Sequence, residues 1–194
     1  MEFLGLNLAR DRRQLPGFGA LLVPLLWLWA VQAPAQQPAR EFRVKAAFLY
    51  NFAQFTEWPE EAFATTNAPL VIGILGEDPF GAAMDSTIRD ETVRGHHLQV
   101  KRGRAVAEMT SCHIVYIGRS EANRLTQVLK ALNGKAVLTV TDLEGAAERG
   151  VMIQFVTEHG RVRFKINPAS ARAAQLTLSS KLLRVADVVS SEKK

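Results

Sequence analysis

Residues 70–75 read Leu-Val-Ile-Gly-Ile-Leu, and this continuous apolar run of strand length decides the fold class. Both faces of such a strand are apolar, as in a parallel sheet that helices cover on both sides. Asp78-Pro79 follows directly. Asp is suited to a helix N-cap and Pro to the first helical position, so we expect a helix over 79–89.

Strand-like and helix-like segments then alternate along the chain. Short apolar runs predict strands over 97–101, 113–117 and 136–141. Between the last two runs, Ser120 is suited to cap a helix that continues to Leu132, and 143–149 is a short helix or turn. This alternation predicts an α/β fold, a single three-layer domain whose mostly parallel sheet is flanked by helices.

The segment before the first strand is typical of a helix over 41–58. Its apolar residues lie at helical spacing on one stripe: Val44, Phe48, Phe52 and Phe55. Pro59 ends the helix, because the residue before a proline disfavours helical backbone. We expect this stripe to pack on the sheet, and a partner-binding face is the alternative.

Two segments near the C-terminus, 151–157 and 161–166, predict an antiparallel hairpin. A turn at His159-Gly160 gives one register. That register pairs Thr157 with Val162, Phe155 with Phe164, Ile153 with Ile166, Glu158 with Arg161, Val156 with Arg163 and Gln154 with Lys165. The first three pairs fall on one face and the last three on the other, which supports the register. Pro168 then begins a C-terminal helical region, with apolar positions at Leu176, Leu182, Leu183 and Val185.

The N-terminus has the pattern of an export signal. Arg10, Arg12 and Arg13 precede an apolar run over 17–31 and the small-residue triplet Ala33-Pro34-Ala35. A helix needs about 20 residues to span a bilayer, and this run is shorter. A membrane anchor that is retained after export is therefore the weaker alternative. We expect a signal peptide at 1–35, a short leader at 36–40, the folded domain at 41–188 and a polar tail at 189–194.

Charge and motifs exclude several classes of function. The 194-residue chain has a formal net charge of +5 without a run of five Lys or Arg, so nothing indicates nucleic-acid binding. The sequence motifs of serine hydrolases, zinc proteases, nucleotide-binding P-loops and paired-cysteine redox proteins are missing. We therefore expect no enzyme, no catalytic residue and no cofactor. The single cysteine, Cys112, begins an apolar strand and is expected to be buried.

The histidines do not predict a metal site. Adjacent His96 and His97 near a strand start point to opposite faces, so they cannot jointly bind one ion in regular strand geometry. His113 lies inside an apolar strand and is expected to be a hydrogen-bonded core residue.

The turn after the first strand is the candidate ligand site. Gly76, Asp78 and Phe80 lie where a strand leads into a helix. Ligands bind at such strand ends in open α/β sheets, and helix N-terminal amides favour anions. A tight, capped turn without a ligand is the alternative.

Seven short stretches, in their order and spacing, resemble the YfiR/HmsC family of periplasmic proteins. They are Val44–Phe52 running on to Glu57–Pro59, Ile72–Gly76 with Asp78–Gly81, Cys112–Ile117, Val137–Asp142, Gly150–Ile153, Val162–Asn167 and Leu178–Leu183. The resemblance covers about residues 41–188. It implies a non-enzymatic regulator that binds the sensory domain of an inner-membrane diguanylate cyclase and holds the cyclase inactive, which restrains cyclic di-GMP signalling and biofilm formation.

The resemblance also implies a homodimer and sequestration by an outer-membrane, peptidoglycan-binding lipoprotein. Disulfides are a further implication, but a chain with one cysteine cannot form an internal one. Because binding energy comes from a few buried anchors, we expect partner contacts at exposed members of an apolar set. This set contains Phe52, Phe55, Trp58, Leu182 and Leu183. A small-ligand sensor that partners a sensor kinase or receptor is the alternative function, and an unrecognised hydrolase is a third.

Overall fold

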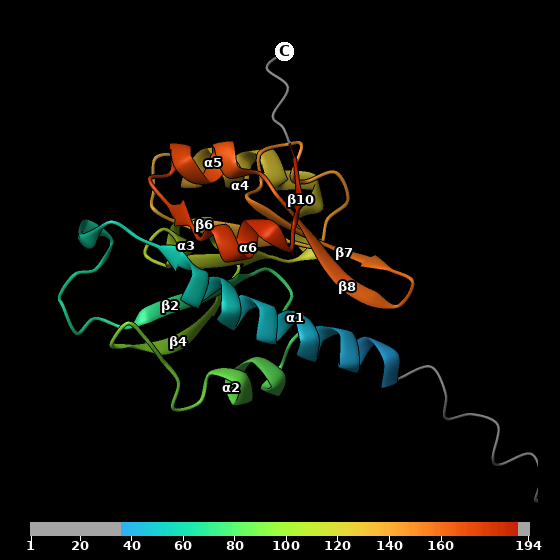
Figure 1. The fold of residues 1–194 in the computed structure, drawn as a ribbon, viewed down its shortest axis with the longest axis horizontal. Coiled ribbons are helices and arrows are strands. Elements are labelled where there is room, and N and C mark those ends of the chain that lie inside the picture. Colours follow the sequence, from blue (N-terminus) through green and yellow to red (C-terminus); the bar gives the residue numbers. More distant parts are fainter. Residues whose placement is uncertain (1–35, 190–194) are drawn as a thin grey trace, which may run out of the picture. The chain divides into compact units, whose positions relative to one another are not determined.

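The central sheet confirms the predicted α/β class. The computed structural model describes residues 36–189, and within them eight strands form one sheet in the order β10-β8-β7-β6-β5-β2-β4-β3 (Figure 1). The strands are β2 (Leu70–Leu75), β3 (Thr92–Val93), β4 (His96–Gly103), β5 (Ile114–Ile117), β6 (Leu138–Thr141), β7 (Ile153–Glu158), β8 (Arg161–Ile166) and β10 (Asp187–Val188). Strands β4, β2, β5, β6 and β7 run parallel, whereas β3 and β8 pair antiparallel with their neighbours.

Helices cover both faces of this sheet. They are α1 (Gln36–Phe55), α2 (Ala82–Ile88), α3 (Val106–Met109), α4 (Leu125–Leu132), α5 (Pro168–Ala173) and α6 (Ser180–Arg184), with short 3-10 turns η2 (Glu60–Ala62) and η3 (Arg119–Arg124). Alternate residues of β5 divide between two cores: Tyr116 packs in the core that includes Phe52 of α1, and Val115 in the core that includes Val128 of α4. In Figure 1, α1 and α6 cross the near face, and α3 and α4 lie behind the sheet.

The first helix differs from its prediction at both ends. It begins at Gln36, so residues 36–40, the predicted leader, have helical backbone. Pro38 is compatible with this start because first-turn amides have no intrahelical acceptor. The helix ends at Phe55 rather than Trp58, because the next two residues form strand β1 (Thr56–Glu57), which pairs antiparallel with β9 (Thr177–Leu178).

The predicted hairpin is confirmed in every pair. Strands β7 and β8 bring Phe155 opposite Phe164 and Val156 opposite Arg163, and the other four predicted pairs follow in the same register. The apolar side of the hairpin packs under α1, where the Phe52 ring lies 5.1 Å from the Phe164 ring and 5.6 Å from the Phe155 ring.

The C-terminal region is less helical than predicted. Two short helices, α5 and α6, are separated by β9 and followed by the edge strand β10. Leu176 and Leu182 are buried as expected, but Val185 is 72% exposed and does not belong to the core. The predicted signal peptide at 1–35 and all but the first residue of the predicted tail lie outside the described residues.

Candidate functional site

The turn that contains Gly76, Asp78 and Phe80 is filled by contacts within the chain. Helix α2 begins at Ala82, so Asp78 is not its N-cap as predicted. Instead, Asp78 Oδ1 accepts the backbone N–H groups of Phe80 (2.7 Å) and Gly81 (3.2 Å). The Arg102 guanidinium donates to Asp78 Oδ2 at 2.7 Å and to Asp85 at 2.8 Å. Phe80 itself is buried, with its ring edge-on to Tyr116.

Gly76 allows a close approach between two loops. Its φ is +91°, and a Cβ at this position would collide with Ser120 Oγ. The Ser120 hydroxyl accepts the Glu77 N–H at 3.0 Å, and Ser120 lies inside η3, so it does not cap the predicted 120–132 helix. The backbone groups of this turn therefore have acceptors in the chain, and ligand binding at Gly76, Asp78 and Phe80 stays a prediction.

A buried charge cluster lies at the same edge of the sheet, directly after β6. Lys45 Nζ donates to Asp142 Oδ2 at 2.8 Å and contacts Glu41 Oε1 at 2.7 Å, and Arg119 Nη2 lies 3.1 Å from Asp142 Oδ2. The side chains of Lys45 and Asp142 are 1% and 2% exposed. Thr157 also donates to Glu41, at 3.0 Å. The cluster joins α1 to the sheet and to the hairpin.

Electrostatics keep the Asp142 carboxylate ionised. Burial acts to raise the pKa of Asp142, but hydrogen bonds and the positive charges of Lys45 and Arg119 outweigh burial and hold the pKa below its ordinary value. Burial and the nearby Asp142 charge raise the pKa of the Tyr116 phenol. Sequence reasoning missed this cluster. The signal was available, because Lys45 occurs next to an apolar stripe and Asp142 follows an apolar strand.

The predicted partner residues divide into buried and half-buried groups. Phe52 and Leu182 are 0% and 4% exposed, so in this conformation they belong to the core, and partner contact at these two residues stays a prediction. Phe55, Trp58 and Leu183 are half-buried. We call these three the apolar rim.

Neighbouring elements carry the apolar rim. Strand β1 follows Phe55 directly and pairs with β9, which immediately precedes α6 and its Leu183. The Ser179 N–H donates to the Phe55 carbonyl at 2.9 Å, which fixes the end of α1 against this segment. Residues far apart in the sequence are therefore brought together at the end of α1.

An aromatic stack lies beside Trp58, at the amino ends of the parallel strands. The Phe63 ring lies between two imidazoles, 4.0 Å from His96 and 4.3 Å from His113. His113 is a buried, hydrogen-bonded residue as predicted, because its Nδ1 accepts the Val71 N–H at 3.0 Å. Burial lowers the pKa of His113, so the ring is held neutral. Trp58 Nε1 donates to the His113 carbonyl at 3.1 Å.

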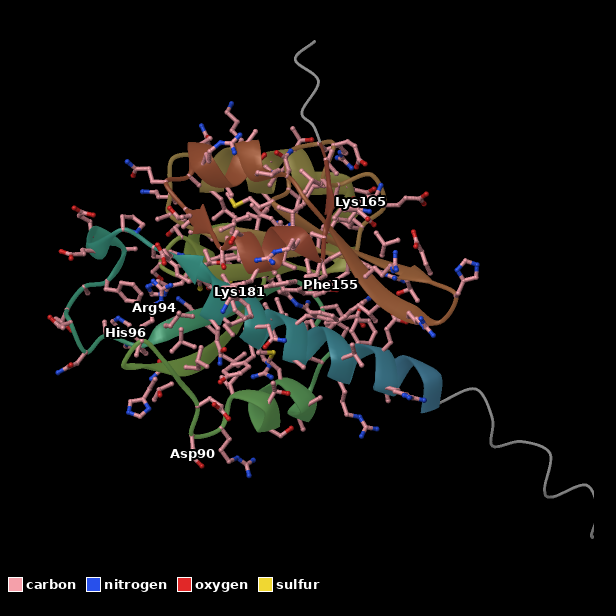
Figure 2. All side chains as sticks on the ribbon, in the orientation of Figure 1. Asp90, Arg94, His96, Phe155, Lys165 and Lys181 are labelled. Atoms are coloured by element: carbon pink, nitrogen blue, oxygen red, sulfur yellow. The ribbon has the colours of Figure 1, made fainter. Side chains whose placement is uncertain are left out.

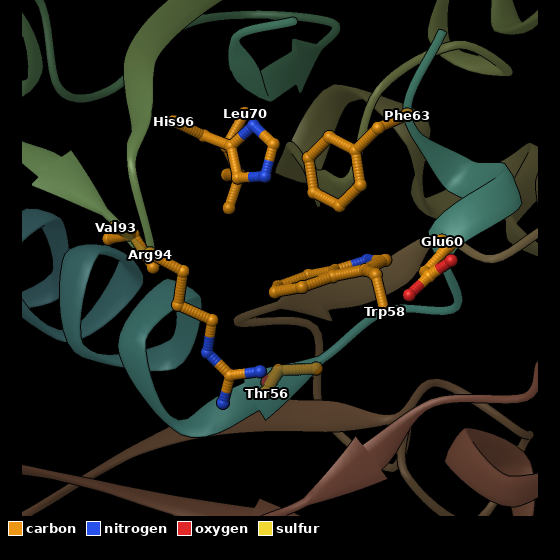
Figure 3. Close-up of a pocket in the computed structure, with 8 residues that line it drawn as sticks. All are labelled: Thr56, Trp58, Glu60, Phe63, Leu70, Val93, Arg94 and His96. Carbon is orange, nitrogen blue, oxygen red and sulfur yellow. The ribbon is translucent and has the colours of Figure 1, made fainter. Parts of the chain in front are cut away.

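A pocket of about 170 Å³ opens next to this stack (Figure 3). Its lining residues are Thr56, Trp58, Glu60, Phe63, Leu70, Val93, Arg94 and His96. They come from β1, η2 and its flanking loop, the start of β2, and the β3–β4 turn. Figure 2 shows Arg94 and His96 well away from Lys165 on the hairpin. Sequence reasoning missed this pocket because its walls come from four separate segments.

Cysteine and metal chemistry have little support among residues 36–189. Cys112 is buried as predicted, its Sγ packs close to Gly73, and burial raises the pKa of the thiol. Over these residues, no group of three His, Cys, Asp or Glu side chains is placed to hold a metal ion. Within the same range, none of the helices has the length and apolar character needed to cross a membrane.

The comparisons with known proteins identify a family. Residues 42–187 match the family described as YfiR/HmsC-like, and this span contains both the charge cluster, except Glu41, and the aromatic pocket. No curated protein matches the chain. Because the match extends over most of the sequence, the chain belongs to the YfiR/HmsC-like family.

Proposed function

We propose that this protein is a periplasmic, non-enzymatic repressor that binds the sensory domain of an inner-membrane diguanylate cyclase. The family match over residues 42–187 is the observation that supports this role. The basic, apolar and small-residue pattern of the first 35 residues supports export. Repression requires that the protein bind the inactive state of the cyclase more tightly than the active state, because equal binding shifts no equilibrium.

The apolar rim is the contact surface in this proposal. Phe55, Trp58 and Leu183 each present part of an apolar side chain while the rest packs on the core. Aromatic side chains are frequent among the residues that dominate binding energy. Trp58 is also fixed in place by its hydrogen bond to the His113 carbonyl, so less conformational freedom is lost when a partner binds.

Binding to a purified cyclase sensory domain tests this surface. We expect Trp58→Ala to weaken binding by about 2 kcal/mol or more, and Leu183→Ala and Phe55→Ala by about 1 kcal/mol each. Val185→Ala is the matched control, since Val185 is an exposed apolar residue outside the rim. Wild-type affinity in all three rim variants, with their folded state checked by thermal unfolding, would contradict the rim as the contact surface.

A small-ligand sensor that partners a sensor kinase or another receptor is the second candidate function. The pocket beside Trp58 favours it, because a ligand there would lie next to the apolar rim. The family also implies a homodimer and a peptidoglycan-binding outer-membrane lipoprotein. We include both in this proposal: the protein associates with a second copy of itself, and the lipoprotein sequesters it.

A further inference from the structure

The pocket at the amino ends of the strands contains an unpaired polar group. Thr56 is fully buried, lines the pocket, and its hydroxyl oxygen has no hydrogen-bond partner. A buried hydroxyl without a partner costs free energy, so native structures rarely keep one without a reason. The oxygen itself has less than 1 Å² of accessible surface, so a ligand with a hydrogen-bonding group removes that cost once the Thr56 side chain rotates towards the pocket.

The walls favour a flat, apolar body. Trp58, Phe63, Leu70 and Val93 provide apolar surface, and in Figure 3 the indole of Trp58 lies across the pocket from His96 and Phe63. Aromatic rings pack well in such sites through stacked or edge-to-face contacts. The volume of about 170 Å³ is close to that of a cavity of about 150 Å³ that holds benzene, so the space suits one six-membered ring.

Arg94 places a positive charge at the mouth of the pocket, where it can pair with a ligand. Arg94 Nη2 lies 2.9 Å from Glu57 Oε1, but the two side chains are 51% and 57% exposed. An ion pair this exposed contributes little, so a ligand carboxylate can replace Glu57 as the partner of the guanidinium. Figure 3 shows the Arg94 side chain reaching along the same side of the pocket as Thr56.

The backbone at Arg94 supports a positional role for this side chain. Arg94 and Gly95 form the two-residue turn between β3 and β4, with φ of +53° and +87°. Asn and Gly are the residues that favour this turn, so an arginine at its first position is locally unfavourable. The turn holds the base of the Arg94 side chain at the rim of the pocket, because Val93 and His96 on either side of it line the same space.

We propose that this pocket binds a monocyclic aromatic carboxylate, with its ring against Trp58 and its carboxylate shared between Arg94 and the Thr56 hydroxyl. The carboxylate accepts hydrogen bonds from both groups, and the hydroxyl thereby gains the partner that it lacks. Glu60, an exposed acidic residue on the pocket wall, is the group that would instead favour a cation. The test therefore includes ligands of both charges.

Calorimetric titration of the full-length protein distinguishes these chemistries. Benzoate is the probe. Benzyl alcohol lacks the charge, cyclohexanecarboxylate lacks the aromatic ring, and benzylamine reverses the charge. We expect benzoate to bind with a dissociation constant of about 1 mM or lower, and each of the other three to bind several-fold more weakly. No heat of binding for benzoate at about 10 mM, or tighter binding of benzylamine, would overturn the proposal.

Two variants locate the bound ligand. Thr56→Val removes only the unpaired hydroxyl, so we expect benzoate affinity to fall about fivefold while the unfolding midpoint does not fall. Arg94→Asn keeps a residue that favours positive φ and removes the cation, and affinity should fall about tenfold. Arg161→Asn, on the exposed end of the hairpin, is the matched control and should leave affinity unchanged. Benzoate binding that both Thr56→Val and Arg94→Asn leave unchanged would place the ligand elsewhere and contradict the assignment.

Discussion

The two ends of the parallel strands differ in the side chains that gather there: ion pairs at one end and aromatic rings at the other. At the carboxyl end, Asp142 Oδ2 pairs with Lys45 and Arg119 while its Oδ1 is buried without a hydrogen-bond partner, and Asp78 pairs with Arg102 and two backbone amides. At the amino end, the pocket next to Trp58 leaves the buried Thr56 hydroxyl without a partner. In open α/β sheets ligands usually bind at the carboxyl end. In this domain that end contains the ion pairs that join loops and helix α1 to the sheet, and the aromatic pocket lies opposite.

The prediction with the largest expected effect tests whether the charge cluster at the carboxyl ends of the strands stabilises the fold. Asp142→Ala leaves Lys45 buried with only the partly exposed Glu41 as partner, so we expect the free energy of unfolding to fall by about 3 kcal/mol. Urea denaturation measures the change. Glu148→Gln, which breaks an exposed ion pair with Lys165, is the control and should cost less than about 1 kcal/mol.

A double variant sharpens this result. Lys45→Met combined with Asp142→Leu removes both charges together, so stability should recover relative to Asp142→Ala.

The pKa of Asp142 is lowered in the folded state, so its contribution to stability is present above pH about 4 and is lost as the pH falls through the folded pKa. An equal loss of stability in Asp142→Ala and Glu148→Gln would contradict a structural role for the cluster.

The next effect concerns the close approach at Gly76. Gly76→Ala introduces a side chain at positive φ and a collision with Ser120, so we expect a loss of about 2–3 kcal/mol. Gly134→Ala is the matched control, since Gly134 has a φ of +73° but open space where a Cβ would lie. It should cost only about 1 kcal/mol. Equal losses in the two variants, measured by urea denaturation, would show that the loop contact contributes nothing.

The prediction with the smallest expected effect concerns His113, at the amino ends of the strands, and the pH dependence of stability. Burial lowers the pKa of His113, so below its ordinary pKa of about 6.5 the unfolded chain takes up a proton that the folded protein does not. Stability should therefore fall between pH about 7.5 and about 5.5, and His113→Gln should reduce this fall. His97→Gln, an exposed histidine of β4, is the control. An unchanged pH dependence in His113→Gln would contradict a neutral, buried His113.

Sequence reasoning succeeded where neighbouring residues determine the structure. Strand β2 matches its predicted bounds, and the β7–β8 register matches in every pair, because a continuous apolar run and a two-faced hairpin are both encoded locally. It failed at the end of α1, where Thr56 pairs with Leu178 more than a hundred residues away. The prediction for the C-terminal region failed for the same reason, because β9, which pairs with β1, interrupts the predicted helix.

The candidate sites show the same limit. Asp-Pro is typical of a helix start and predicts Asp78 as a helix cap, but the helix has Gly81 at its N-cap and Asp78 pairs with Arg102 instead. Phe52 was one residue of an apolar stripe, and the stripe pattern does not show which members remain accessible. The pocket beside Trp58 combines side chains from positions 56 to 96, a combination that neither periodicity nor a motif reveals.

Cellular cyclic di-GMP in a deletion strain tests the central claim most directly. The strain receives either the exported protein or a form without residues 1–35. If this protein is a periplasmic repressor of a diguanylate cyclase, deletion raises cyclic di-GMP and only the exported form restores the parental level. Unchanged cyclic di-GMP on deletion, or equal restoration by the form without residues 1–35, would contradict that role.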